Sequence, residues 1–217
     1  NPTTYSAVTT ADGEDFREIA LCRHAQRWLC EHVRSHPDEP FLCFVSTPGP
    51  HWPCVVPERY AARYDWRTIP LPPNLHDTDG KPAAHRIYRD EAGESGTLSD
   101  EEWQKCLARY YAFVTLIDEH FGEILDTLDE LGVAEQTLVV YLTDHGDIMG
   151  SHRLFDKGPF MYEEMVHIPL IMRWPVRIPT DQVIQPFVSL LDLLPTLLEA
   201  ADIPLPPKLD GRSLWPL

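Results

Sequence analysis

The sequence lacks long hydrophobic runs, paired cysteine motifs and an excess of basic residues, and each absence excludes a class of protein. No stretch reaches the roughly 18 apolar residues that span a bilayer, so we expect no membrane span. The five cysteines are odd in number and include no CxxC pair, which argues against a disulfide framework and a structural zinc site. The formal net charge of −16 would repel a duplex, so we expect no nucleic-acid partner.

The start of the chain bears on its location. No signal peptide is recognisable, and cysteines without a disulfide pattern favour a cytoplasmic location. The chain opens on NPTTYSAVTTADGEDF without an initiator methionine, which reads like sequence from the middle of a protein. We therefore expect a cytoplasmic protein whose true N-terminus lies outside these residues.

The remaining composition is that of a globular protein with ordered loops. Hydrophobic residues make up 43% and charged residues 24% of the 217, enough for a sizeable domain or for part of a larger one. The 21 prolines are about double the usual share, which indicates long ordered loops.

The strongest helical pattern covers residues 99–131. Ser99 and Glu102 have the spacing of a capping box, and Gly132 stands where a helix terminator belongs. The apolar stripe between them comprises Leu107, Tyr110, Tyr111, Val114, Ile117, Phe121, Ile124, Leu125, Leu128 and Leu131.

Short apolar stretches alternate with further helical patterns. Residues 137–142 (TLVVYL) are apolar on both faces, as a central parallel strand should be, and residues 40–46 and 167–172 are further strand candidates. Residues 12–35 and 187–201 have helical patterns, and the second helix is expected to start near Asp192. This order predicts an α/β fold with a mainly parallel central sheet flanked by helices.

Charged and titratable residues follow two of these strands. Asp144 and His145 come after residues 137–142, and His51 comes after residues 40–46. Ligands of open α/β sheets bind outside the carboxyl ends of the strands. A carboxylate and a neutral imidazole side by side can hold one divalent cation, but Asp144 could equally cap a turn and His145 could be a packed loop residue.

Three further residues are candidates for binding an anion or moving a proton. Lys157 can neutralise an oxyanion or simply be solvated, and His152 is equally ambiguous. His51 lies between Pro50 and Pro53, which restrict its backbone. It could protonate a leaving oxygen or serve as a structural hydrogen-bonding residue.

Five motifs in a fixed order resemble the sulfatase family of the alkaline-phosphatase-like superfamily of α/β hydrolases. They are PGPHWP, YYAFVTLIDEHFGEILDTLDELG, TLVVYLTDHGDIMGSHRLFDKG, HIPLIMRWP and VSLLDLLPTLLEAADIPLPPKLDGRSLWPL. The resemblance runs from about residue 16 to the end. It implies that residues 1–217 are the C-terminal portion of a sulfatase-like catalytic domain, present as a partial domain. The loop-rich residues 55–97 would then lie near the substrate pocket.

The resemblance also implies roles for the candidate residues. Asp144 and His145 look like two ligands of an active-site divalent cation, Ca²⁺ in the first place and Mn²⁺ or Mg²⁺ as alternatives. Many sulfatases have Asn in the second place, whereas His is found in others and in phosphonate monoester hydrolases. Lys157 and His51 look like the catalytic pair that binds the sulfate and assists the leaving oxygen, with His152 as a further substrate-binding residue.

The sequence does not contain the nucleophile that the family requires. That nucleophile is a formylglycine made from Cys or Ser in a C/S-x-P-x-R motif. Cys54 is followed by Val-Val-Pro-Glu-Arg, with the Pro and Arg one place too far along. We therefore expect the formylglycine, together with an Asp-Asp pair of metal ligands, in an N-terminal part of the same catalytic domain, and we expect the 217 residues alone to be inactive.

The resemblance thus predicts a sulfuric ester hydrolase that acts on a small-molecule or saccharide sulfate ester. Two alternatives remain open at this point. The first is a phosphonate or phosphate ester hydrolase on the same scaffold. The second is a non-catalytic interaction domain that has kept the fold.

Overall fold

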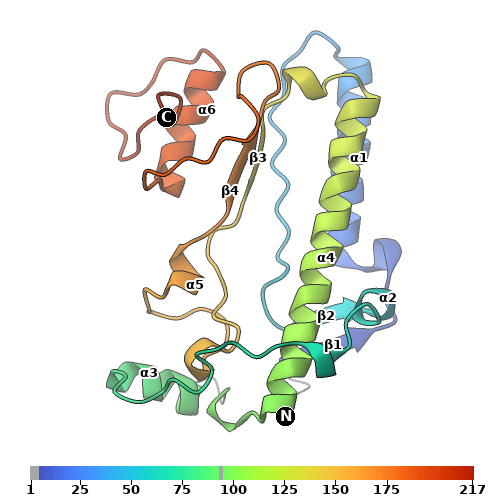
Figure 1. Cartoon of the computed structure of the whole chain (residues 1–217). Coiled ribbons are helices and arrows are strands. Elements are labelled where there is room, and N and C mark those ends of the chain that lie inside the picture. Colours follow the sequence, from blue (N-terminus) through green and yellow to red (C-terminus); the bar gives the residue numbers. More distant parts are fainter. Residues whose placement is uncertain (1–4, 93–94) are drawn as a thin grey trace. The chain divides into compact units, whose positions relative to one another are not determined.

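The computed structural model describes residues 5–92 and 95–217, and these divide into a larger unit up to Trp174 and a smaller unit, Pro175–Leu217. In the described residues the helices are α1 (Arg17–Ser35), α2 (Glu58–Ala61), α3 (Ala83–Ile87), α4 (Asp100–Glu130), α5 (Glu163–Val166) and α6 (Leu193–Ala200). The strands are β1 (Ser6–Thr9), β2 (Cys54–Pro57), β3 (Val139–Leu142) and β4 (Leu170–Arg173) (Figure 1). None of the described helices is both long and apolar enough to cross a membrane.

Helix α4 confirms the predicted helix at residues 99–131, including its capping box. The Ser99 hydroxyl accepts the Glu102 N–H at 3.3 Å, and Glu102 Oε2 accepts the Ser99 N–H at 2.7 Å. These bonds satisfy two donors at the helix start that would otherwise lack partners.

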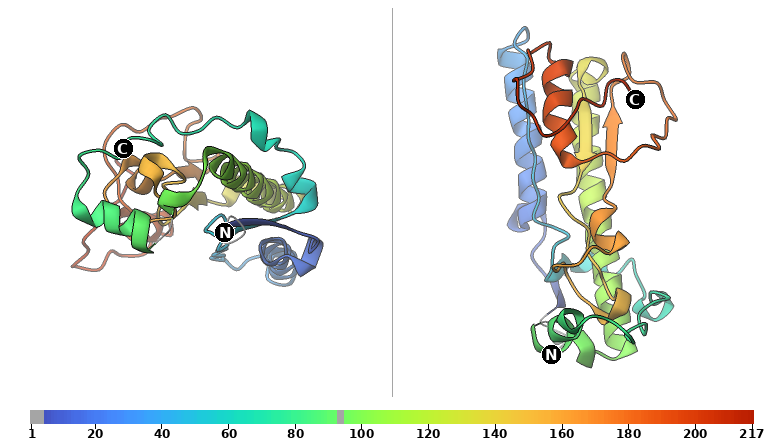
Figure 2. Two further views of the ribbon diagram at one scale, coloured as in Figure 1. Left: turned by 90° about the horizontal axis from the view of Figure 1, so that it is seen from below. Right: turned by 90° about the vertical axis from the view of Figure 1, so that its left-hand side faces the viewer.

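Helices α1 and α4 pack side by side and run in the same direction (Figures 1 and 2). The Phe16 ring at the start of α1 lies 6.0 Å from the Phe113 ring near the middle of α4, and further along Gln26 Nε2 donates to Glu123 Oε2 at 3.2 Å. Because both contacts advance by ten residues on each helix, the two axes stay aligned over about three turns.

The main core lies along one face of α4. Trp103 and Leu116 of α4 are 0% exposed, as is Ile19 of α1. The predicted stripe differs in detail, because Val114 is 41% exposed and Tyr111 is 38% exposed. The apolar pattern alone does not fix how far the buried face wraps around the helix.

The strands form one parallel and one antiparallel pair. β1 pairs in parallel with β2, and β3 pairs in antiparallel fashion with β4. The predicted strands at residues 137–142 and 167–172 are thus confirmed in β3 and β4. The expected parallel pairing of the first is wrong within the described chain, where β3 is half-buried and its hydrogen-bonded neighbour is β4.

The predicted strand at residues 40–46 does not form. Among the described residues this segment pairs with no strand. Phe41 and Cys43 pack against the cluster between α1 and α4, whereas Leu42 is 83% and Phe44 is 84% exposed. The segment has the alternation of a strand, but a strand also requires a hydrogen-bonded neighbour.

The smaller unit is built on α6, which confirms the core of the helix predicted at residues 187–201. The Asp192 carboxylate accepts the N–H groups of Ser189 and Arg212, each at 2.9 Å. Thr196 Oγ1 accepts the Leu214 N–H, also at 2.9 Å. The residues after the helix therefore fold back along it.

Two truncations in α4 test how this helix is buried. We expect Leu116→Ala to lower the free energy of unfolding by about 2–5 kcal/mol, because it opens a cavity in the core. Val114→Ala, on the same helix but exposed, should change it by less than about 0.5 kcal/mol. Urea unfolding of both variants gives the comparison, and equal losses would contradict the assigned orientation of α4.

Candidate active site

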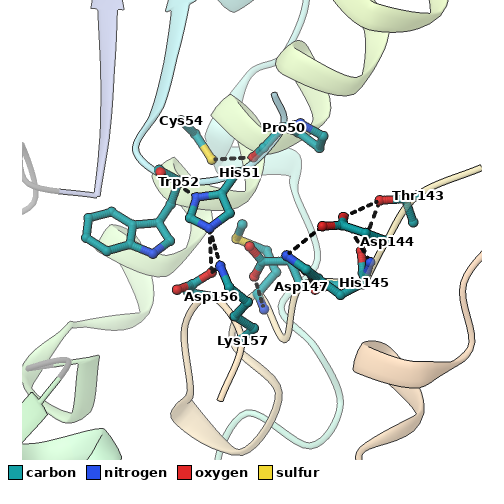
Figure 3. Close-up of polar contacts among 12 residues, drawn as sticks. Pro50, His51, Trp52, Cys54, Thr143, Asp144, His145, Asp147, Asp156 and Lys157 are labelled. Atoms are coloured by element: carbon teal, nitrogen blue, oxygen red, sulfur yellow. Dashed lines mark hydrogen bonds and ion pairs between the residues drawn. The ribbon is translucent and has the colours of Figure 1, made fainter. Parts of the chain in front are cut away.

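Loops that are distant in the sequence meet at one place (Figure 3). His51 lies just before β2, Asp144 and His145 follow β3, and Lys157 lies in the loop before α5. The rings of His51 and His145 have centroids 5.9 Å apart, and Lys157 Nζ contacts His51 Nε2 as a hydrogen-bond partner. The structure therefore brings together the four residues for which the main roles were predicted.

An aromatic cluster around Phe155 positions two of these loops. The Phe155 ring is 4% exposed and lies 5.7 Å from the ring of Trp103 on α4. The rings of Tyr5 and Trp52 lie 4.8 and 6.3 Å from it. Because Trp52 follows His51 and Phe155 comes two residues before Lys157, the cluster fixes both backbones relative to α4.

Asp144 and His145 bring a carboxylate oxygen and an imidazole nitrogen close to each other. His145 Nδ1 lies 2.9 Å from the Gly146 carbonyl and must donate to it, which leaves the Nε2 lone pair free. This Nε2 lies 3.7 Å from Asp144 Oδ2. The Asp144 carboxylate is itself oriented by the His145 N–H, which donates to Oδ1 at 3.0 Å.

The donor set fits a divalent cation as part of its coordination shell. Asp144 supplies hard oxygen and His145 supplies a neutral imidazole nitrogen with the correct tautomer. In residues 5–92 and 95–217, no group of three or more potential ligands gathers at one point. Since Ca²⁺ takes about 6–8 oxygen ligands and Mg²⁺ six, this pair can supply only a part of the shell.

Gly146 is required by a close approach of two backbones. A Cβ at this position would lie 1.8 Å from the carbonyl oxygen of Glu164 in α5. The Gly146 N–H donates to the Met165 carbonyl at 3.0 Å. The glycine after the Asp-His pair thus lets the loop lie directly against α5.

The orientation of His51 is fixed by a backbone contact. Its Nδ1 lies 2.8 Å from the Trp52 carbonyl and donates to it. The Nε2 atom therefore faces Lys157 and is the nitrogen available for proton transfer. The side chain is 38% exposed, so a substrate can reach it.

Asp156 belongs to this site but was missed by the sequence analysis. Its Oδ1 lies 3.4 Å from His51 Nε2 and 3.3 Å from Lys157 Nζ, and its side chain is 17% exposed. Its backbone has a φ of 62°, in the left-handed region that Asp tolerates better than most residues. Adjacency to Lys157 was the available signal, but the sequence did not show which way the carboxylate turns.

Asp147 is a second carboxylate that the sequence analysis did not select. Burial raises its pKa to about 6, and the charge of Asp156 adds to this rise. The N–H of Met149, which donates to Asp147 Oδ1 at 2.9 Å, acts in the opposite direction.

His152 joins a different group of side chains. It is 8% exposed, its ring stacks on Tyr162 with centroids 4.5 Å apart, and its Nδ1 donates to the Asp77 carbonyl at 3.1 Å. These contacts do not bring it to His51 or Lys157. Its expected role in substrate binding stays a prediction.

His85 is the most deeply buried histidine of that group. It is 1% exposed, and neither ring nitrogen has a hydrogen-bond partner among the described residues. Its ring lies 6.3 Å from that of His152 and 5.8 Å from that of Phe160. Burial lowers the pKa of His85, and the nearby charge of Arg89 lowers it further.

Cys54 is unsuited to act as a nucleophile. It is 0% exposed in β2, and burial raises the pKa of its thiol. Its Sγ donates to the Pro50 carbonyl at 3.7 Å. This supports the interpretation of its near-match to the C/S-x-P-x-R motif as coincidental.

Known proteins share both the sequence pattern and the fold. The sequence profile of the sulfatase family matches residues 13–203. The chain is 36% identical to the uncharacterized sulfatase YidJ of Escherichia coli K12, over 82% of this chain and 35% of that protein. It is 30% identical to an arylsulfatase of Clostridium perfringens, over 88% of this chain and 41% of that protein.

A solved structure shows the same fold. The phosphonate monoester hydrolase SpPMH from Silicibacter pomeroyi superposes with a TM-score of 0.80 at 28% identity, over 94% of this chain and 41% of that chain. The protein therefore has the α/β fold of the alkaline-phosphatase-like class, as predicted. The chain belongs to the sulfatase family. It spans about two fifths or less of the length of the relatives named here.

A glycine substitution tests the close approach beside the site. We expect Gly146→Ala to destabilise the protein by about 1–3 kcal/mol or more, because the added Cβ meets a backbone oxygen that cannot rotate away. Gly122→Ala in α4 is the matched control, since a Cβ there meets nothing within 4 Å. The control should stabilise by up to about 1 kcal/mol, as Ala favours a helix. If thermal unfolding gives both variants the same shift, the assigned contact is wrong.

The buried His85 predicts a pH dependence of stability. Its native pKa is lowered, so the unfolded state binds the proton more readily, and stability falls as the pH drops below about 6.5. Replacement by phenylalanine should flatten this loss between about pH 7 and 5.5. Urea unfolding at several pH values measures the two slopes; identical slopes would contradict the prediction.

Proposed function

We propose that the protein hydrolyses sulfate esters of small molecules or saccharides, as part of a longer sulfatase catalytic domain. The observation that carries the proposal is the meeting of His51, Asp144, His145 and Lys157 from separate loops at one place. Membership of the sulfatase family supports a hydrolase that acts on sulfuric esters.

Lys157 and His51 would act on the two oxygens that gain charge. The Lys157 ammonium stabilises a non-bridging sulfate oxygen, and its contact with His51 supports this role. Sulfur bonds to the nucleophile as its bond to the bridging oxygen breaks, and the electron pair of the broken bond moves to that oxygen. His51 Nε2 gives that oxygen a proton, which releases the alcohol.

Asp144 and His145 would hold a divalent cation, with Ca²⁺ as the first choice and Mn²⁺ or Mg²⁺ as alternatives. When bound, such a cation polarises the sulfate and offsets its charge. Gly146 keeps both ligands on one rigid turn against α5.

The nucleophile is proposed to be a formylglycine on a part of the polypeptide outside these 217 residues. The same part would supply the Asp-Asp pair that completes the metal shell. None of the five cysteines stands in a C-x-P-x-R setting, and the relatives are longer than this chain. The 217 residues alone would then have no turnover.

Residues 55–97 are proposed to form one wall of the substrate pocket. The Tyr88 hydroxyl donates to the Lys157 carbonyl, and the Asp77 carbonyl accepts from His152. Both contacts tie this segment to the loop that carries Lys157. His152 is proposed as a further substrate-binding residue.

A second candidate is hydrolysis of phosphonate or phosphate esters. The resemblance to a phosphonate monoester hydrolase favours it, and the Asp-His metal pair is compatible with both reactions. We also propose a cytoplasmic location, with which the five free cysteines are compatible.

Two measurements test the proposed function. Intact-mass spectrometry and peptide mapping of the full natural polypeptide should find a cysteine or serine converted to formylglycine. The same polypeptide should hydrolyse an aryl sulfate faster than an aryl phosphonate, and Asp144→Ala or Lys157→Ala should lower kcat/KM by about 100-fold or more. Asp181→Ala, an exposed change in the smaller unit, is the control.

Each alternative has its own outcome. Faster turnover of the phosphonate would favour the second candidate. If the full polypeptide turns over neither ester, and added Ca²⁺, Mn²⁺ or Mg²⁺ leaves the thermal stability of the wild type and of Asp144→Ala unchanged, the non-catalytic interaction domain is favoured.

A further inference from the structure

The carboxylate of Asp156 lies between the two residues that the proposed mechanism uses. One oxygen, Oδ1, is 3.4 Å from His51 Nε2 and 3.3 Å from Lys157 Nζ. Figure 3 shows the three side chains converging from two loops. A single oxygen shared by both groups couples their orientations, since neither can turn without breaking a contact with it.

The backbone of Asp156 is held from the adjoining turn. Its carbonyl accepts the Ile148 N–H at 2.9 Å. Its φ of 62° is in the left-handed region, so the backbone changes direction at this residue. The preceding residue, Phe155, packs in the aromatic cluster, and this packing holds the backbone that carries the Asp156 carboxylate.

The charges explain why a carboxylate is useful at this point. Lys157 and His51 are in direct contact, and a protonated imidazole beside an ammonium is repelled by it. The negative charge of Asp156 attracts both groups and offsets that repulsion. The side chain is mostly shielded from water, which strengthens its effect relative to an exposed ion pair.

We propose that Asp156 is a positioning residue that holds the proton of His51 Nε2 and the ammonium of Lys157 side by side at the leaving oxygen. This inference rests on the proposed function. Asp156 itself neither gains nor loses a proton: the proton goes from His51 to the bridging oxygen, while sulfur bonds to the nucleophile and its bond to that oxygen breaks. The residue therefore matters most for esters whose leaving alcohol is a poor leaving group.

The charge of Asp156 is tested with Asp156→Asn in the full natural polypeptide. Asparagine keeps the size and tolerates the left-handed backbone, so the change removes mainly the charge. We expect kcat for an alkyl sulfate to fall at least tenfold, whereas kcat for 4-nitrophenyl sulfate, which needs no proton, falls less than about threefold. Asp181→Asn is the matched control, because Asp181 is exposed and has a similar φ of 59°.

Equal losses on both esters, or no loss on either, would overturn the role of Asp156. A second measurement does not depend on turnover: a double-mutant cycle on the free energy of unfolding with Asp156→Asn and Lys157→Met. We expect the double variant to lose less stability than the sum of the single variants, and strict additivity would contradict the contact. If the wild type hydrolyses neither ester, the proposed function fails, while the cycle still decides whether Asp156 holds Lys157.

Discussion

The aromatic contact between Phe155 and Trp103 is the interaction on which the site depends. Trp103 is fully buried at the start of α4, and α4 in turn packs along α1. Since the Phe155 ring also lies against Trp52, one cluster sets the positions of the His51 loop and the Lys157 loop together. The polar groups can then meet at hydrogen-bonding distance although 106 residues separate them in sequence.

The charge balance of the site would give the proposed cation a second purpose. Asp144, Asp147 and Asp156 place three carboxyl groups in the loops of the site, where Asp156 contacts Lys157, in a chain whose net charge is −16. A sulfate ester is an anion and would be repelled by such surroundings. A divalent cation at Asp144 and His145 would reverse the local sign, and the raised pKa of Asp147 already removes part of the negative charge at mildly acidic pH.

The sequence predicted those features that depend on local chemistry. The capping box at Ser99 and the apolar run before Asp144 each act through neighbours in the chain, and both α4 and β3 formed where expected. The antiparallel partner of β3 and the unpaired state of residues 40–46 depend on segments far away, which a local pattern does not encode. Asp156 was missed for a related reason. Its carboxylate points toward His51 and Lys157 from a left-handed backbone, and the neighbouring residues in the sequence do not specify that conformation.

The exposed side chains of Leu42 and Phe44 have a consequence for the behaviour of the chain in solution. An extended apolar segment without a strand partner is a template on which a second copy can add a strand. At low ionic strength the charge of −16 keeps copies apart, and added salt screens that repulsion over about 10 Å at 0.1 M. Whether the 217-residue chain aggregates therefore depends on two opposing effects: the exposed apolar segment favours association, and the net negative charge opposes it. Buffer of low ionic strength favours the dispersed chain.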